Sequence, residues 1–358
     1  MTSMKTVKMN VLSFSMGRQR NLRGMTLVEL LVAMAVGLLV IAVAVAALGV
    51  SQRGAREVDA ASQLRDDARF AASIIQRLGV QTGFEDLKSA TQPYYGTESL
   101  YKSGTGLNIA DFMPSVFGYN NGIPSASDPI NNVKSRSASS EGYGSDVLIL
   151  QNQVVKLDPK SSLSDKSMIN CMGVSPDKAS IDRKDRIISV FYLGKPAGEG
   201  GMSLMCATQN AKGLYDVQPL IKNVETFQVL YGVDNVTPNK APTGHSSSVP
   251  NGYLRADQLT VVGDPVATYT NWRRVRSLRI GLVLQGPRGT APNNAEIKHY
   301  PFGDARYANS ADPGSEFITK DNRLHQTVTF TVQLRNCQNQ GYQPENSTVP
   351  CDVVVPTP

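Results

Sequence analysis

The sequence lacks several catalytic and ion-binding motifs that have a recognisable spacing. Its 358 residues contain no GxSxG nucleophile motif, no HExxH zinc motif, no phosphate-binding Walker loop and no EF-hand loop. Histidine is scarce, and His245, His299 and His325 are scattered along the chain. We therefore expect a protein that is not an enzyme, and we assign no catalytic residue, no cofactor and no metal site.

Acidic residues are absent from the segment 1–24, and the basic balance of the chain originates there. The chain has 36 Lys and Arg against 30 Asp and Glu, and five of the cations are Lys5, Lys8, Arg18, Arg20 and Arg23. Removing these five leaves 31 against 30, so the remainder is nearly neutral. A basic protein invites a nucleic-acid interpretation, but positive charge ahead of an apolar span instead holds the N-terminus in the cytoplasm.

Cysteine is also rare, and no two cysteines have the CxxC spacing of a zinc site. The four cysteines, Cys171, Cys206, Cys337 and Cys351, suggest two disulfides if this part of the chain is exported. Four cysteines allow three connectivities, of which we favour the nearest-neighbour pairing, Cys171–Cys206 and Cys337–Cys351. Whether the second of these loops is a tail staple or contacts a partner stays open.

Two further absences define the N-terminal region. No proline occurs in residues 1–92, and no charged residue occurs from Leu30 to Val50. A helix over that run is about 30 Å long and spans the hydrocarbon core of a bilayer. The run fits a secretory signal with its cleavage site at Ala44-Val45-Ala46, a plain membrane anchor, or a signal that is cut on the cytoplasmic side before the apolar residues.

Glu29 separates these three alternatives. A carboxylate at the edge of an apolar span costs a few kcal/mol, so it usually has a role. Neither a secretory signal nor a plain anchor gains anything from it. We therefore favour the signal that is cut before the apolar run.

Beyond Val50 the apolar residues continue with helical spacing. Successive positions are three or four residues apart, as on one face of an α-helix, and they are Val58, Ala61, Leu64, Ala68, Ala71, Ile75 and Leu78. The pattern predicts one helix from Met25 to about Leu78, roughly 80 Å long. Its first half would lie in lipid or a fibre core, and its second half would pack on a folded domain.

The residues at the start of this helix resemble the type IV prepilin family. Arg23-Gly24 followed by Met25-Thr-Leu-Val-Glu29 matches that family's basic residue, glycine, cleavage point and glutamate at the fifth mature position. The resemblance implies that prepilin peptidase cleaves between Gly24 and Met25 and that the new amine of Met25 is methylated. It also implies that Glu29 pairs with the N-terminal amine of a neighbouring subunit, which offsets the cost of a carboxylate in lipid.

Two positions depart from the usual family pattern. Met25 stands where phenylalanine is usual, and Ala46 stands where major pilins often carry a proline. Any melting of the helix in a fibre would then come from Gly37, Gly49 or Gly54, each of which weakens a helix by roughly 1 kcal/mol relative to alanine. The alternative, that these glycines only permit close helix packing, stays open.

The rest of the chain favours strands. Residues 83–145 are rich in Gly, Ser, Asn, Pro and Tyr, which predicts a variable connecting region with short elements. The patterns that follow indicate about six strands in one antiparallel sheet packed on the long helix. The predicted strands are 146–157, 186–193, 202–208, 224–233, 275–285 and 325–335, with a short helix between 253 and 272.

Three later segments resemble the PilW type of minor pilin within the prepilin family. They are 220–234 (LIKNVETFQVLYGVD), 272–284 (WRRVRSLRIGLVL) and 329–336 (TFTVQLRN). The resemblance implies an α+β, type IV pilin-like fold. In that fold a long N-terminal helix, first membrane-spanning and then amphipathic, packs on an antiparallel β-sheet.

The expected organisation has five parts. They are a leader peptide at 1–24 that is removed, a transmembrane or fibre-core helix at 25–50, the amphipathic second half of the helix at 51–82, the variable connecting region at 83–145, and a β-rich periplasmic or pilus-surface domain at 146–358. Before assembly we expect a single-pass inner-membrane protein with a cytoplasmic N-terminus and its bulk in the periplasm. After assembly we expect it in an extracellular pilus.

The resemblance implies a minor pilin that helps prime pilus assembly at or near the tip and so supports twitching motility and adhesion. The implied partners are other minor pilins, the major pilin, a large tip adhesin, prepilin peptidase and an inner-membrane platform protein. Two alternatives remain, namely a J-like pseudopilin of a type II secretion system and a DNA-uptake pilin. The basic run Arg273, Arg274, Arg276 and Arg279 is the best candidate for DNA contact, although a charged face on an exposed strand is the commoner explanation.

Overall fold

The computed structural model describes residues 24–86, 114–181, 185–243, 246, 249–291 and 293–336. The chain divides into two compact units, Met1–Ala55 and Arg56–Pro358. The leader before Gly24, His245 and the predicted Cys337–Cys351 pair lie outside the described residues.

The long helix α1 runs from Leu27 to Gln81, which is 55 residues without a break. Sequence analysis predicted Met25 to about Leu78, so the observed helix begins two residues later and ends three residues later. No proline removes a backbone donor along this length, and leucine and alanine are good helix formers.

In the second unit α1 buries one continuous face. The buried residues are Ala60, Leu64, Ala68, Ala71, Ile75, Leu78 and Gly79. At its start the predicted face was wrong, because Val58 is 69% exposed and Ala60 is buried instead. Each three-residue step falls about 60° short of a full turn, so two successive steps rotate Val58 about 120° away from Leu64.

The C-terminal end of α1 is held by a residue from the far end of the described chain. The Asn336 side-chain amide donates hydrogen bonds to the carbonyls of Val80 at 3.2 Å and Thr82 at 2.9 Å. Carbonyl groups at the C-terminal end of a helix have no hydrogen-bond donor within the helix, so Asn336 supplies one. Gly83 follows with φ of +77°, a conformation that favours glycine and commonly ends helices.

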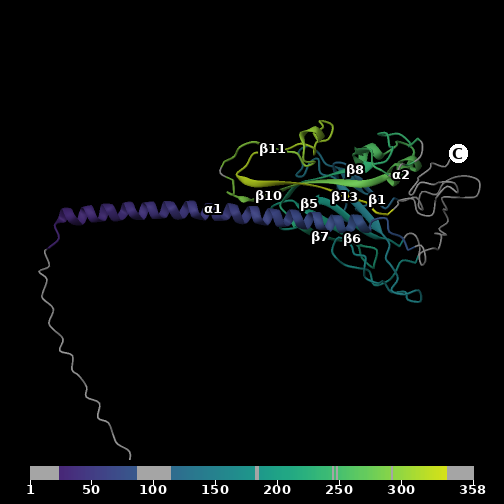
Figure 1. Ribbon diagram of the computed structural model, residues 1–358, viewed down its shortest axis with the longest axis horizontal. Coiled ribbons are helices and arrows are strands. Elements are labelled where there is room, and N and C mark those ends of the chain that lie inside the picture. The colour runs from purple at the N-terminus through teal and green to yellow at the C-terminus, as the bar shows by residue number, and fades with distance from the viewer. Residues whose placement is uncertain are drawn as a thin grey trace, which may run out of the picture. The chain divides into compact units, whose positions relative to one another are not determined.

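The larger of two main sheets has five antiparallel strands in the order β1-β4-β5-β6-β7. Figure 1 labels β1, β5, β6 and β7 of this sheet. Their bounds are Val116–Tyr119 for β1, Val147–Asn152 for β4, Ile187–Gly194 for β5, Ser203–Gln209 for β6 and Tyr215–Lys222 for β7. Strands β4, β5 and β6 match three of the predicted strands. Strand β1 belongs to the region that was expected to connect the helix and the sheet.

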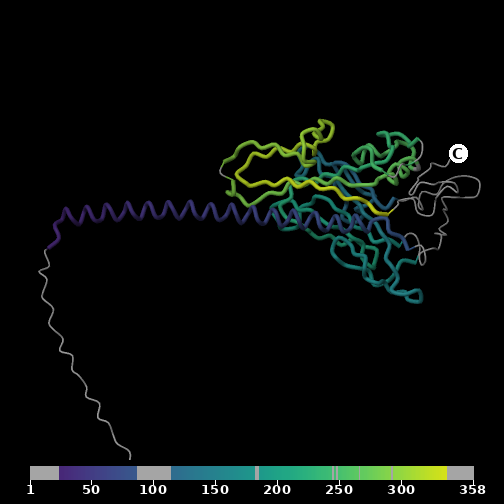
Figure 2. Tube along the Cα trace, viewed as in Figure 1, coloured from purple at the N-terminus to yellow at the C-terminus, as the bar shows by residue number. Residues whose placement is uncertain are grey.

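The second main sheet has the antiparallel order β13-β10-β8-β9. Its strands are Val224–Val233 for β8, Gly252–Leu254 for β9, Val275–Arg288 for β10 and Arg323–Gln333 for β13. Three of these four were predicted. Strands β10 and β13 pair along most of their length, although a long excursion separates them in sequence (Figure 2).

Smaller elements complete the second unit. They are the pairs β2 (Gly122–Pro124) with β3 (Val133–Ser135) and β11 (Ile297–His299) with β12 (Phe317–Thr319), the helix α2 (Pro265–Arg273), and the 3-10 turns η2 (Ala256–Leu259) and η3 (Ala305–Tyr307). Helix α2 and turn η2 fall in the segment where a short helix was expected. Asp264 caps α2 by accepting a hydrogen bond from the Ala267 backbone at 2.8 Å.

The buried face of α1 shares one hydrophobic core with residues from both main sheets, including Phe191, Phe227 and Ile280. This confirms the expected α+β fold, a long apolar N-terminal helix packed on antiparallel sheet. The expectation of one sheet was too simple, because the described strands form two larger sheets. Alternation of apolar and polar residues along the sequence shows which strands have a buried face, but it does not show which strands pair.

Asp146, just before β4, ties the two main sheets together. Its carboxylate accepts backbone hydrogen bonds from Val229 in β8 at 2.8 Å and from Asn121 at 3.0 Å. Its own backbone donates to the Phe227 carbonyl at 2.8 Å. Burial raises the pKa of this carboxyl well above its usual value, and the charge of Asp312 raises it further.

Candidate functional site

The N-terminal segment is the first candidate site, and its geometry follows from Thr26. Residues 24–26 are not helical, and α1 begins at Leu27. The Thr26 hydroxyl accepts from the Glu29 backbone at 3.2 Å, and its carbonyl accepts from the Leu30 backbone at 3.1 Å. Thr26 is therefore the helix N-cap, and Glu29 occupies the third helical position, where the helix dipole favours negative charge.

This cap leaves the Gly24–Met25 bond outside the helix and open to solvent. Both residues are exposed, and Met25 is 60% exposed. A Cβ added at Gly24 would meet no described atom within 4 Å. The described part of the chain therefore gives no packing reason for a glycine at this position.

The first half of α1 presents apolar side chains and buries none of them in its own chain. Large hydrophobic residues from Leu27 to Val50 are each at least 49% exposed. Among the described residues, α1 is the helix that is long and apolar enough to cross a membrane, by length and composition. Contact between these apolar side chains and water is unfavourable. The surface is therefore more stable when lipid or other protein covers it.

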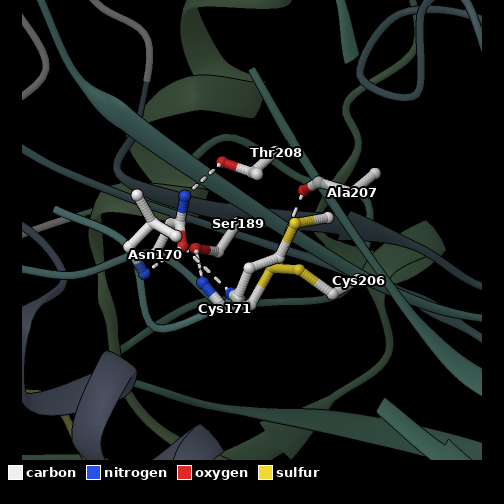
Figure 3. Close-up of a disulfide and its surroundings, with 8 residues drawn as sticks. Asn170, Cys171, Ser189, Cys206, Ala207 and Thr208 are labelled. Carbon is white, nitrogen blue, oxygen red and sulfur yellow. Dashed lines mark hydrogen bonds between the residues drawn. A yellow bond between two sulfur atoms is a disulfide. The ribbon is translucent and has the colours of Figure 1, made fainter. Parts of the chain in front are cut away.

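The disulfide joins Cys171 to Cys206, which is the pairing that we favoured for these two cysteines (Figure 3). Cys206 lies in β6, whereas Cys171 belongs to the connection between β4 and β5. The Cys171 backbone also donates to the Ser189 hydroxyl at 3.0 Å. Both sulfur-bearing residues belong to the main core, so the bridge pins a long connection onto the five-stranded sheet.

The three segments that resemble the PilW type become neighbours in space. They supply β8, β10 and β13, which are adjacent strands of the four-stranded sheet. Trp272, just before β10, packs edge-on against Tyr231 in β8 with ring centroids 4.7 Å apart. Gly281 in β10 lies so close to the Pro301 carbonyl that an added Cβ would be 2.4 Å from its oxygen. Residues of these three segments, Tyr231 and Trp272 among them, belong to the hydrophobic core of the second unit.

The basic run that spans the end of α2 and the start of β10 does not form an exposed face, so that expectation was wrong. Arg273, Arg274 and Arg276 are at most 8% exposed. Arg276 donates to Ser246 at 2.9 Å and lies 3.9 Å from the Asp234 carboxylate. Arg279 lies over the Tyr307 ring at 4.2 Å. These guanidinium groups serve the fold, and their burial removes the main support for DNA contact.

One cluster of titratable groups was not anticipated. Glu225, Asp321 and His325 each offer a ligand atom, and these three atoms lie within 4.8 Å of one another. The rings of His299 and His325, which belong to different strands, are 5.3 Å apart. Only the Asp321–His325 spacing is visible in the sequence, because Glu225 arrives from β8, almost one hundred positions earlier in the chain.

Two family models match this chain, one over its N-terminal segment and one over its second half. Residues 190–336 match the family model of type IV pilus-assembly protein W (PilW), and residues 19–45 match the prokaryotic N-terminal methylation motif. No curated protein matches the chain significantly. Among solved structures, the chain is similar to a type IV-like pilin from Thermus thermophilus at 12% sequence identity and a TM-score of 0.31. That alignment covers 77% of this chain and 98% of the other.

The two family matches confirm the resemblance to type IV prepilins and, from β5 onward, to the PilW type. The first match ends at Asn336, the residue that holds the end of α1. The second match contains Gly24, Met25 and Glu29. Both matches point to a structural protein and not to an enzyme.

Proposed function

We propose that this chain, which resembles type IV prepilins at its N-terminus and PilW over its second sheet, is a minor pilin that helps prime pilus assembly at or near the tip. The observation that carries the proposal is the N-terminal segment. An exposed glycine, a capped helix start, a carboxylate in the first turn and an unburied apolar helix follow one another between Gly24 and Val50. Pilus biogenesis, twitching motility and adhesion would depend on it.

The exposed apolar half of α1 supports two successive environments. Burying one large aliphatic side chain is worth about 1.5–3 kcal/mol, so a helix with many of them is strongly driven out of water. Before assembly the inner membrane would cover this surface, with the basic leader holding the N-terminus in the cytoplasm. In the fibre, the helices of neighbouring subunits would cover it.

The surroundings of Glu29 support the proposed assembly contact. Its backbone is used by the Thr26 cap, whereas its carboxylate makes no hydrogen bond or ion pair with the described residues. A carboxylate within an apolar surface is stabilised when a cation lies beside it. The methylated amine of Met25 in an adjacent subunit would supply that cation after cleavage between Gly24 and Met25.

The partners follow from the same proposal. Prepilin peptidase would process the precursor, and an inner-membrane platform protein would accept it. Other minor pilins and the major pilin would then pack along α1, and a large adhesin would complete the tip. The predicted Cys337–Cys351 loop, near the C-terminus, would staple the tail or contact one of these partners.

A J-like pseudopilin of a type II secretion system is the second candidate. The N-terminal segment supports it equally, because secretion pseudopilins resemble prepilins in this part. The match of residues 190–336 to a pilus-assembly family favours the pilus.

The sharpest test compares Glu29→Gln with Asp59→Asn in a strain that lacks the chromosomal copy. Both changes remove one carboxylate from α1 with little change of shape, and Asp59 is exposed in the second unit. We expect both variants to be processed normally, while Glu29→Gln lowers the amount of this protein in sheared pili by about tenfold or more. That loss corresponds to about 1.4 kcal/mol of a charged contact.

Equal amounts of the two variants in sheared pili would sink the assembly role of Glu29. The uncomplemented strain decides between the two filament systems. Loss of surface pili and twitching with normal protein secretion supports the minor pilin, and the opposite pattern supports the pseudopilin.

A further inference from the structure

We propose that the outer edge of β13 binds an extended segment of a different pilus subunit, which adds a strand to the four-stranded sheet. This inference rests on the proposed function, because it takes the partner from the pilus. Strand β13 runs from Arg323 to Gln333 and lies at one side of the sheet order β13-β10-β8-β9. Among the described strands it pairs with β10 alone. Its other edge therefore carries backbone groups that no described strand uses.

The register with β10 shows which backbone groups of β13 point outward. The Leu334 amide donates to the Arg276 carbonyl at 2.9 Å, so the Leu334 amide faces β10. Backbone groups alternate in direction along a strand, and the pairing has no shift between Ser277 and Gln285. The residues whose N–H and C=O groups point away from β10 are therefore odd-numbered, namely Thr327, Thr329, Thr331 and Gln333.

These outward groups have no hydrogen-bond partner in the described part of the chain. The backbone hydrogen bonds outside the strand ladders include none from these four residues. Thr329, Thr331 and Gln333 are exposed, so the edge is open over this stretch. Outward groups recur at every second residue, about 6.8 Å apart. Another extended backbone presents donors and acceptors at the same repeat, so this edge is complementary to a β-strand.

The other edges of the two main sheets are short or guarded. Strands β1 and β9 have four and three residues. Strand β7 has eight residues, but it contains Pro219, which has no N–H to donate, and it ends at Lys222. Shortness, proline and lysine are features with which proteins prevent unwanted pairing at a sheet edge. Strand β13 has 11 residues and contains neither proline nor lysine, so its edge is suited to accept a strand.

The side chains along the edge specify the chemistry of the incoming segment. Val328 and Phe330 are only partly buried where they pack against the main hydrophobic core, so the core extends to this edge. Thr329 and Thr331 alternate with them and are exposed on the opposite face. Side chains that lie opposite each other on paired strands contact each other. We therefore expect a segment that alternates, with apolar residues beside Val328 and Phe330 and polar or β-branched residues beside the threonines.

A second copy of this chain fits the edge less well than a different subunit does. Strand β13, yellow in Figure 2, runs in the same direction as the second half of α1 and leads to Asn336 at the end of that helix. Antiparallel pairing is slightly more stable per residue than parallel pairing. Two copies that paired antiparallel through β13 would direct their α1 helices oppositely, which is incompatible with insertion into one membrane. A loop or terminal segment of a different subunit has no such constraint.

Thr331→Pro is the test variant, because its ring replaces one outward N–H. The hydrogen bonds between β13 and β10 use other residues, and proline is tolerated on an edge strand where its nitrogen faces solvent. Thr331→Val is the matched control, since it removes the same exposed hydroxyl but keeps the N–H. Each variant is produced in a strain that lacks the chromosomal copy, and the amount of this protein in sheared pili is compared with the parent.

We expect Thr331→Pro to lower that amount by about tenfold or more, because a donor is lost and the ring occupies the place of the partner strand. Thr331→Val should stay within about twofold of the parent, since valine is a good strand former. Urea unfolding of the purified, processed chains in detergent should give the same midpoint for both variants. A loss from pili then reports on pairing and not on folding.

Amide hydrogen exchange of the parent chain tests the same edge without a substitution, so it decides the question even if proline unfolds β13. The chain is compared in detergent and in sheared pili. We expect the amides of Thr327, Thr329, Thr331 and Gln333 to exchange quickly in detergent and to be protected in pili, because a partner strand accepts their hydrogens only in the assembled fibre.

Several outcomes would overturn the inference. Parent-like amounts of a folded Thr331→Pro variant in pili, or edge amides that remain unprotected there, would overturn it and leave the proposed function intact. Slow exchange of these amides already in detergent would show that the chain covers its own edge. A dimer in detergent that Thr331→Pro dissociates would assign the edge to a second copy. Absence of the parent itself from pili would overturn the proposed function together with this inference.

Discussion

Residues 24–26 have different positions relative to the start of α1. Thr26 caps the start of the helix by accepting the Glu29 backbone, and Gly24 and Met25 remain outside the helix. Nothing in the described chain lies within 4 Å of a Cβ at Gly24. A substitution there cannot disturb the packing of the described residues, so any effect on processing reports directly on the peptidase.

Gly24→Leu should therefore give an uncut precursor of normal stability. We expect a protein longer by the whole leader on a blot, still in the membrane and absent from pili, because the bulky side chain blocks cleavage after this position. Gly54→Ala is the matched control, since its Cβ also meets nothing within 4 Å. A mature-length product from Gly24→Leu would contradict the cleavage site.

At the scale of elements, the disulfide decides how well the long connection between β4 and β5 is fixed. Cys171 and Cys206 are 35 residues apart, and the bridge attaches the connection to the middle of β6. The chain-entropy model gives about 4 kcal/mol for a loop of this length. The same connection has a second anchor, because the Asn170 amide donates to Thr208 in β6 at 3.2 Å.

Replacing both cysteines by alanine should lower the free energy of unfolding by roughly 2–4 kcal/mol. Alanine is chosen because a buried serine would add a polar group without a partner. Urea unfolding of the processed chain in detergent measures the effect, with Thr208→Val testing the second anchor separately. An unchanged unfolding midpoint for the double alanine variant would show that the bridge adds nothing to stability.

At the scale of the whole second unit, buried carboxyl groups couple the fold to pH. Burial raises the pKa of Asp312 to about 6, against the opposing effect of Arg255. In an unfolded chain the pKa of aspartate is about 3.9. Between about pH 4 and pH 6 the folded protein thus holds a proton that the unfolded protein has released, and this group's contribution to stability falls as pH rises.

Asp312→Asn should therefore flatten the dependence of thermal stability on pH in that window. Relative to the parent, the variant gains as pH rises, by up to about 3 kcal/mol for a shift of about two pKa units. Thermal unfolding of the processed chain from pH 4 to pH 7 measures this, with the exposed Asp59→Asn as control. Parallel curves for Asp312→Asn and the parent would refute the assignment.

Much of the candidate site could be predicted because it is contiguous. The proposed cleavage point, the carboxylate and the apolar run all lie between Gly24 and Val50, so spacing alone orders them, whereas the Thr26 cap was not predicted. Asn336, the last residue of a PilW-like segment, could not be assigned a role that way. Its amide donates to the carbonyls of Val80 and Thr82, which lie 256 and 254 positions earlier in the chain.

The sequence by itself determined the long apolar helix, to within two residues of its start, and the residues proposed for cleavage and assembly, because local hydrogen bonds and hydrophobicity depend only on neighbours along the chain. Tertiary structure alone decided which strands pair in two sheets, and that Arg273, Arg274 and Arg276 are buried rather than exposed. It also brought Glu225 to His325. These outcomes depend on register and long-range packing, where a one-residue shift sends a side chain to the opposite face.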